Sequence, residues 1–196
     1  MKIINKIDKL IEEYHKNSII RNNGTVLLRP GKIPKARHIL FKGLTDEEVN
    51  TYLISEYEHN FPKEYETFLK FYNGVDLFFA KVKKGNVEFA TSHLTVYGLP
   101  RTKPFGRKLD NEEPFDVRIE DTSRNVNIPN TWLKFGSYKR TSVFGERVDL
   151  FIDTVDGHLY SCNRNDDKII SQWNSFDECL CEIFDQSLLS KEVYIY

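Results

Sequence analysis

The stretch from residue 44 to residue 74 constrains the fold most, because it carries the start and stop signals of two helices. Thr45 is followed three residues later by Glu48, the spacing of a capping box, in which each side chain accepts a hydrogen bond from the other residue's backbone amide. A helix should therefore begin directly after Thr45. Pro62 predicts the start of a second helix, since its fixed φ and missing N–H cost nothing in a first turn. Asn73-Gly74 predicts the end of that helix.

Apolar residues recur three and four positions apart in both predicted helices, which places them along one face of each. They are Val49, Tyr52, Leu53 and Tyr57 in the first helix and Tyr65, Phe68, Leu69 and Tyr72 in the second. We interpret the aromatic residues among them as core residues, because helical spacing of this kind is typical of a buried stripe.

Composition predicts a globular protein with a sizeable aromatic core. The chain has 196 residues, of which 40% are hydrophobic and 29% charged, and it contains 14 Phe and 10 Tyr but one Met. The N-terminus has charges where a signal peptide needs an apolar block, and no window reaches the roughly 18 apolar residues of a membrane span. We therefore expect a cytoplasmic protein with no membrane association. Its three cysteines predict free thiols and no zinc site, and nothing in the sequence calls for a cofactor.

Charge is distributed unevenly along the chain. Residues 1–42 contain ten basic and three acidic residues, a balance of +7, whereas the whole chain has a net charge of −1. Residues 2–16 read as an amphipathic helix, and residues 22–41 read as a connector in which only Thr25 to Leu28 could form a strand. We interpret residues 1–43 as a basic N-terminal helix and solvated connector, separate from a domain at 44–196. The alternative is a binding site for nucleic acid or an acidic partner.

The remaining elements are strands, followed by one last helix. A hairpin is predicted at 75–82 and 86–92, short strands at 93–99 and 115–119, a strand at 132–138, and a three-stranded meander at 147–152, 158–162 and 169–173. Residues 100–114 read as a long surface loop. Ser175 and Glu178 repeat the capping-box spacing before a final amphipathic helix. Segregated helices and strands predict an α+β fold, an antiparallel sheet with helices packed against it.

A search for catalytic residues gives one candidate cluster, Asp149, Asp153, Asp156 and His158. These residues fall on predicted strands and a tight turn, where neighbouring side chains face different ways, and turn chemistry alone explains Asp156-Gly157. The sequence has no nucleotide-binding, nucleophile-elbow or zinc-protease motif. We therefore expect a protein that is not an enzyme.

A series of ordered landmarks runs through the chain. Its opening part is Phe61, Pro62, Tyr65, Phe68, Leu69, Asn73 and Gly74, followed by Gly98 after an apolar and an aromatic residue. Its later part is Trp132, Phe135, Gly136, Asp153, Gly157, Tyr160, Trp173, Ser175 and Phe176. In this order and spacing the landmarks resemble the SUKH superfamily, which includes bacterial toxin-immunity proteins and fungal cell-wall-assembly regulators. The resemblance covers about residues 44–186, and Val75 replaces a second glycine of the family pattern.

The resemblance implies a SUKH-like domain that works by binding, with these landmarks in structural roles. It implies a bacterial immunity protein, or antitoxin, whose partner is a protein toxin, commonly a nuclease. An acidic stretch fits such a partner, and we take its acids as the predicted toxin contacts: Asp110, Glu112, Glu113, Asp116, Glu120 and Asp121. An ordinary solvated loop would have the same composition.

The alternative function is a regulatory adaptor that uses the basic N-terminal arm. We expect a monomer or weak dimer and no nucleic acid as the main partner.

Overall fold

The computed structural model describes residues 1–29, 37–55, 62–84, 87–91, 93–99, 118–119, 128–140 and 145–189. Its helices are α1 (Lys2–Tyr14), the short 3₁₀ helix η1 (His15–Asn17), α2 (Asp46–Ser55), α3 (Lys63–Phe71) and α4 (Phe176–Leu189). Its strands are β1 (Ser18–Ile20), β2 (Val26–Leu28), β3 (Arg37–Lys42), β4 (Tyr72–Lys84), β5 (Val87–Thr91), β6 (Leu94–Val96), β7 (Arg118–Ile119), β8 (Trp132–Lys139), β9 (Arg147–Asp153), β10 (Leu159–Asn163) and β11 (Ile169–Trp173).

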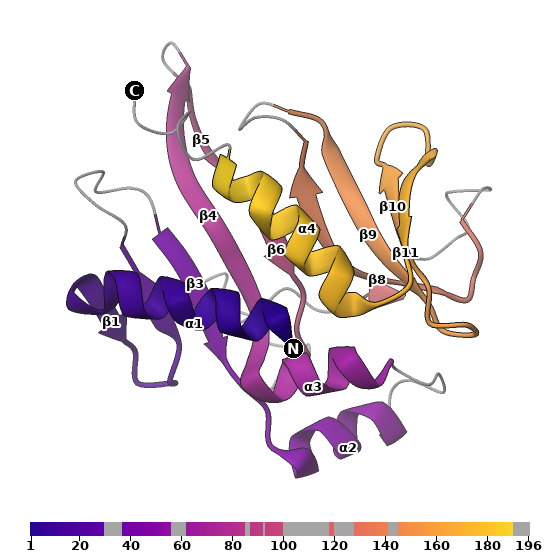
Figure 1. The fold of residues 1–196 in the computed structure, drawn as a ribbon, viewed down its shortest axis with the longest axis horizontal. Coiled ribbons are helices and arrows are strands. Elements are labelled where there is room, and N and C mark those ends of the chain that lie inside the picture. The colour runs from indigo at the N-terminus through magenta and orange to yellow at the C-terminus, as the bar shows by residue number, and fades with distance from the viewer. Residues whose placement is uncertain are drawn as a thin grey trace.

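The described strands form one antiparallel sheet, which confirms the predicted α+β class. Nine strands follow the order β1-β2-β3-β4-β6-β8-β9-β10-β11, while β5 pairs with β4 and β7 pairs with β8. Figure 1 shows this sheet from the side on which α1 and α4 lie across it. The predicted β4–β5 hairpin and the β9–β10–β11 meander are confirmed by their cross-strand registers.

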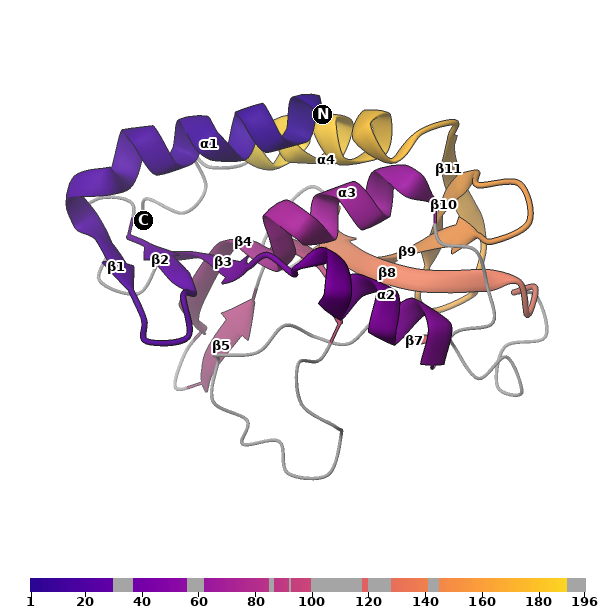
Figure 2. The same ribbon diagram turned by 90° about the horizontal axis from the view of Figure 1, so that it is seen from below.

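Helices α1, α3 and α4 lie on one side of the sheet, and α2 lies beside α3 (Figure 2). The main core fills the space between these helices and the strands. Phe176 occupies its centre, where its ring lies 5.1 Å from that of Tyr65, 5.4 Å from that of Phe68 and 5.3 Å from that of Phe135. The stripe predicted on the second helix is a core element at Tyr65, Phe68 and Leu69, which are all fully buried. Tyr72 is instead the first residue of β4 and packs against this core while only partly buried.

The predicted capping box of α2 is present in full. The Thr45 amide donates to Glu48 Oε2 at 2.8 Å, and the Glu48 amide donates to Thr45 Oγ1 at 3.1 Å. Val49 is buried as predicted. The side chains of Tyr52 and Leu53, and all of Tyr57, lie outside the described part of the chain.

The N-termini of α1 and α4 are capped by acids from other helices. The Phe176 amide donates to Glu64 Oε2 of α3 at 2.7 Å, in addition to the predicted bond from the Glu178 amide to Ser175 Oγ at 3.1 Å. The amides of residues 2 and 3 in turn donate to the Asp177 carboxylate, both at 2.9 Å. These contacts join α3, α4 and α1 through groups that each helix start would otherwise leave unpaired.

The prediction that Gly74 ends α3 is wrong. The helix ends at Phe71, and Gly74 lies inside β4 with φ +88. The register between β3 and β4 shifts here, so that two residues of β4 lie opposite Phe41, which is a β-bulge. A helix C-terminus and a bulge both favour glycine at positive φ, and this shared requirement explains the error.

The prediction of a connector at residues 22–41 is also wrong for the part that the structure describes. β1, β2 and β3 extend the same sheet, although β2 at Val26–Leu28 agrees with the one strand predicted there. The signal was weak because β1 and β2 have three residues each, and β3 is buried on both faces and so shows no alternation. The division of the chain at residue 43 stays a prediction, and the hydrogen-bonded sheet continues across it.

Candidate functional site

A row of residues in register crosses the face of the sheet that points away from the helices. Asp76, Thr95, Ser137 and Asp149 are successive cross-strand partners on β4, β6, β8 and β9. Asp76 lies between Val75 and Leu77, which both belong to the main core, so its side chain points to the opposite face. All four polar residues are buried, and Thr95 Oγ1 donates to Asp76 Oδ1 at 2.7 Å.

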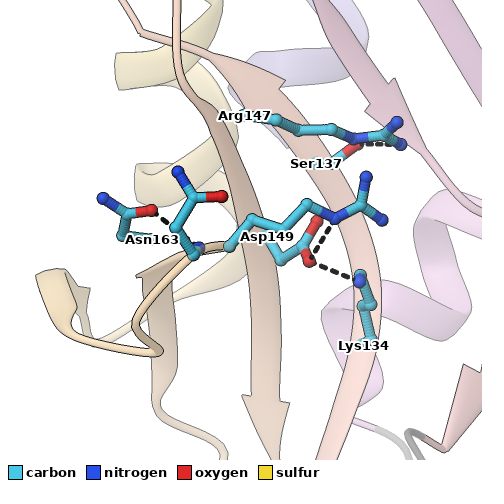
Figure 3. A network of polar contacts seen from close by, with 7 residues as sticks. Lys134, Ser137, Arg147, Asp149 and Asn163 are labelled. Carbon is cyan, nitrogen blue, oxygen red and sulfur yellow. Dashed lines mark hydrogen bonds and ion pairs between the residues drawn. The ribbon is translucent and has the colours of Figure 1, made fainter.

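The β9 end of this row forms the candidate site, which we call the β8–β10 polar cluster: Lys134, Ser137, Arg147, Asp149 and Arg164 (Figure 3). Lys134 Nζ donates to Asp149 Oδ2 at 2.5 Å, and Arg164 Nε lies 3.5 Å from the same oxygen. Arg147 Nη2 donates to Ser137 Oγ at 3.0 Å. Two cations thus contact the Asp149 carboxylate, and with Arg147 the cluster holds three cations and one anion, which gives it a net positive charge.

Asp149 is a buried carboxylate, and one of its two oxygens has no hydrogen-bond partner. Its exposed fraction is 6%, and its Oδ1 atom has no hydrogen-bond partner. Lys134 is 4% exposed, so the ion pair between them is shielded from water. Removing one member of such a pair leaves the other as an uncompensated buried charge, which is far more costly than losing an exposed pair.

The two arginines are the accessible part of the cluster. Arg147 is exposed, and the Arg164 side chain is 49% exposed. A guanidinium has five N–H donors, and the described contacts use Nη2 of Arg147 and Nε of Arg164. Burial, with the nearby charge of Arg147 as the second cause, lowers the pKa of Lys139 at the end of β8. The cluster can therefore bind carboxylate or phosphate groups of a partner, while Asp149 and Ser137 hold the arginines in place.

Aromatic side chains adjoin the polar cluster on the same face. The rings of Trp132 and Tyr160 stack at 4.1 Å, and Lys134 Nζ lies 5.9 Å from the centre of the Phe151 ring. Trp132 Nε1 donates to Asp153 Oδ2 at 3.0 Å, so that this landmark pair joins β8 to β9. These residues form a second, smaller apolar cluster with Ile128 and Cys162.

The four residues of the candidate catalytic cluster do not point into one common site. They are Asp149, Asp153, Asp156 and His158. Asp149 contacts Lys134, and Asp153 accepts from Trp132 and from the Val155 amide at 2.9 Å. Asp156 accepts from the His158 amide at 2.8 Å and pairs with His158 Nδ1 at 2.9 Å, and the side-chain hydrogen bond from His158 lowers the pKa of Asp156. Each of these acids is occupied by a local structural contact.

The landmark residues lie at positions where their chemistry is used structurally. Asn73 Nδ2 donates to the Leu99 carbonyl at 2.6 Å, and the Leu99 amide donates back to Asn73 Oδ1 at 2.7 Å. A Cβ at Gly98 would overlap the carbonyl oxygen of Asn73, so glycine is required where these two backbones approach closely. Trp173 Nε1 donates to Glu182 Oε2 at 2.8 Å.

Three further landmarks belong to backbone turns and close contacts. Pro62 is the N-cap residue of α3, directly before its first turn. A Cβ at Gly136 would overlap the carbonyl oxygen of Thr95 on the neighbouring strand. Gly157 has φ +76 in the turn between β9 and β10. Phe61 lies outside the described residues.

The six predicted toxin contacts, Asp110, Glu112, Glu113, Asp116, Glu120 and Asp121, also lie outside the described residues. Two residues of the same stretch are described, and they form β7. Arg118 pairs with Lys134, and Ile119 pairs with Leu133, both on β8. The described part of this stretch, residues 118–119, therefore pairs with the sheet at a residue of the β8–β10 polar cluster.

Other site chemistry is sparse in the described residues. Cys162, Cys179 and Cys181 are all free thiols, and burial raises the pKa of Cys162 to about 11, which keeps it protonated near neutral pH. Among the described residues, no group of three or more His, Cys, Asp or Glu side chains is arranged to hold a metal ion. None of the described helices is both long enough and apolar enough to span a membrane.

Comparison of the sequence with protein-family models and with curated proteins finds no match. The resemblance to the SUKH superfamily therefore stays a prediction based on the ordered landmarks.

No pattern in the sequence identified Lys134, Arg147 and Arg164 as members of a site. One signal was available for Lys134, because a lysine in the middle of the apolar run WLKF predicts either an exposed face or a buried partner. The partner on the next strand could be identified only from the register of β8 and β9.

Proposed function

We propose that this protein is an immunity protein that binds and neutralises a protein toxin, and that it acts in the cytoplasm of the cell that makes it. The ordered SUKH-like landmarks support the proposal. The pairing of β7 with β8 supports the site, because residues 118–119, which belong to the acidic stretch, lie opposite Lys134 and Leu133. This pairing is the observation that carries the choice of surface.

An acidic contact surface suits a nuclease as the toxin. The active-site cleft of a nuclease is basic because it binds a polyanion, so clustered carboxylates are attracted to it over several ångströms and speed the encounter. The same attraction is screened by salt, with a Debye length of about 8 Å at physiological ionic strength. Binding should therefore weaken as salt rises, mainly through the association rate.

The toxin gene nearest to the gene for this protein supplies the test. The two proteins are co-expressed, survival of the cells is scored, and the purified pair is titrated at low and at physiological salt. We expect survival, a stable complex and an affinity that falls with salt. Continued toxicity despite full expression of the folded protein would contradict the immunity proposal.

Charge reversal tests the surface separately from the function. Glu112→Lys with Glu113→Lys should weaken toxin binding at least tenfold and reduce its salt dependence. A matched control reverses two exposed acids elsewhere, Glu12→Lys with Glu47→Lys, and should leave binding within about twofold. If both pairs weaken binding equally, net charge and not this stretch governs the encounter. If neither does while survival persists, the surface is wrong and the function stands.

A further inference from the structure

Strand β1 forms an exposed edge of the sheet and carries exposed apolar side chains. β1 pairs with β2 and is the terminal strand on its side of the sheet. Ile19 is 43% exposed and Ile20 is 73% exposed. Consecutive residues of a strand point to opposite faces, so the edge presents one isoleucine on each face of the sheet. Sheet edges of this kind are usually protected, because their free backbone groups pair with other chains.

The backbone at Ile20 points away from the sheet. The Arg21 amide donates to the Thr25 carbonyl at 2.9 Å across the β1–β2 turn, which makes these two residues a hydrogen-bonded pair. Hydrogen-bonded and non-hydrogen-bonded pairs alternate in an antiparallel ladder, so the next pair, Ile20 with Val26, is non-hydrogen-bonded. The N–H and C=O groups of Ile20 therefore face the free edge and can accept one residue of an added strand.

The apolar surface of the edge continues into the sheet. Ile19, Leu27 and Ile39 are successive cross-strand partners, so their side chains lie in a row on the face away from the helices. Leu27 and Ile39 are buried in a cluster with Phe41. An added strand with an apolar residue opposite Ile19 would extend this row by one position.

The sequence around the edge strand is basic. The sequence from Lys16 to Lys42 contains seven basic residues and no acid, and Lys16 and Arg21 stand on either side of β1. Burial lowers the pKa of Arg37, the charges of Arg21 and Arg29 lower it further, and the charge of Asp76 raises it, so three guanidinium groups lie near one another and near one acid. Carboxylates of a partner would be attracted to this excess of positive charge. The nearest acids before this segment are Glu12 and Glu13, near the end of α1.

We propose that the β1 edge binds an extended, acidic segment of a partner protein, which adds to the sheet as a further strand and places carboxylates beside Arg21. The backbone of Ile20 supplies register, the two isoleucines supply apolar contact, and the basic residues select the charge of the partner. A second copy of this chain is disfavoured at this edge, because pairing β1 with itself would bring two basic edges together. The inference does not depend on the toxin, and such an edge would serve the adaptor role that the sequence leaves as an alternative.

The probe is a fluorescein-labelled nine-residue peptide of alternating valine and glutamate, with binding to the full-length protein followed by fluorescence anisotropy at low salt. We expect this peptide to bind at least tenfold more tightly than the same peptide with lysine in place of glutamate. N-methylation of alternate amides should weaken binding at least tenfold, because it removes backbone donors and leaves the charges unchanged. Absence of binding by the acidic peptide at millimolar protein would overturn the proposal.

Two variants locate the site on the protein. Ile20→Ser and Arg21→Glu should each weaken binding of the acidic peptide at least tenfold. Ile169→Ser on β11 is the matched control, because Ile169 is 54% exposed on the opposite terminal strand, and it should change binding less than twofold. Melting curves establish that all three variants are folded. Equal losses in Ile20→Ser and Ile169→Ser would overturn the assignment to β1.

Two further measurements distinguish other occupants of the edge. Sedimentation that shows a dimer in the wild type and a monomer in Ile20→Ser would overturn the proposal in favour of a second copy. Tight binding of a 20-nucleotide single-stranded DNA that Arg21→Glu abolishes and Ile20→Ser leaves unchanged would overturn it in favour of nucleic acid. A monomer that binds the acidic peptide more tightly than the DNA supports it.

Discussion

The β1 edge and the β8–β10 polar cluster lie in opposite halves of one sheet and differ in how their charges are arranged. In the cluster, Lys134 and Asp149 are both buried and neutralise each other at 2.5 Å. At the edge, the sequence from Lys16 to Lys42 contains seven basic residues and no acid, and Ile20 is 73% exposed. Breaking the buried ion pair would be costly to the fold, whereas the exposed edge of β1 can gain contacts only from an added strand. The buried part of the cluster therefore serves the fold, while its exposed arginines and the β1 edge are available for recognition.

The largest expected effect is on stability, in the cluster. Asp149→Asn keeps the shape of the side chain and leaves the Lys134 charge buried without its counter-ion, so the free energy of unfolding should fall by about 3–5 kcal/mol. Urea denaturation followed by fluorescence measures this loss. Asp185→Asn, which breaks the exposed pair between Lys6 and Asp185, is the control and should cost less than about 1 kcal/mol. A loss at Asp149 as small as the control would remove the distinction between the two ends.

Acid should destabilise the protein through His93, a buried residue directly before β6 that contacts α4. His93 Nδ1 lies 2.9 Å from Ser187 Oγ, and burial, with the charge of Lys139 as a second cause, lowers the pKa of His93 to about 4. Between about pH 6.5 and pH 4 the unfolded chain therefore binds a proton that the folded chain does not, so stability falls as pH falls. We expect a loss of about 2 kcal/mol over this range from His93.

His93→Asn is the matched variant for this pH dependence, because an asparagine amide can replace the polar contact of Nδ1 with Ser187 and does not titrate. Its unfolding free energy should fall less than that of the wild type between pH 6.5 and pH 4. Identical pH profiles in the two proteins would show that His93 is not the group responsible.

A smaller loss of stability is expected when an exposed residue of the cluster is removed. Arg164→Ala removes a partly exposed partner of Asp149 and leaves the shorter contact with Lys134, so it should cost no more than about 1 kcal/mol. The same denaturation measurement applies. A cost equal to that of Asp149→Asn would mean that the three charges act as one unit.

The smallest effect on stability is expected at the edge. Ile20→Ser removes a side chain that is 73% exposed, so the free energy of unfolding should change by less than about 0.5 kcal/mol. A change above about 1.5 kcal/mol would show that Ile20 already packs inside the folded chain. The edge would then not be available as a docking site.

Local signals in the sequence predicted the helices and most strands. The capping box at Thr45 and Glu48 places the start of α2 correctly, because the interaction involves residues three positions apart. The sheet edge could not be predicted in the same way. β1 is too short for alternation, and the hydrogen bonds that define it depend on residues further along the chain. Gly74 carried a correct signal for positive φ, but the signal could not distinguish a helix end from a bulge.

The candidate site was the least predictable part of the molecule. Lys134 and Asp149 are 15 residues apart, and only the pairing of β8 with β9 brings them together. The predicted acidic contacts follow from composition, which identifies charge but not its place on the fold. The structural roles proposed for the landmarks were easier to anticipate from the sequence. Glycine, asparagine and tryptophan each have backbone or side-chain properties that few other residues can replace.

Amide hydrogen exchange of the free protein tests the contrast between the two ends of the sheet most directly. The account predicts that the Ile20 amide, which faces the free edge, exchanges nearly as fast as an unfolded amide, whereas amides in β9 around Leu150 exchange only on global unfolding. Adding the acidic peptide should then slow exchange at Ile20 and leave β9 unchanged. An Ile20 amide that is as strongly protected as those of β9 in the free protein would contradict the account, because the edge would already be paired.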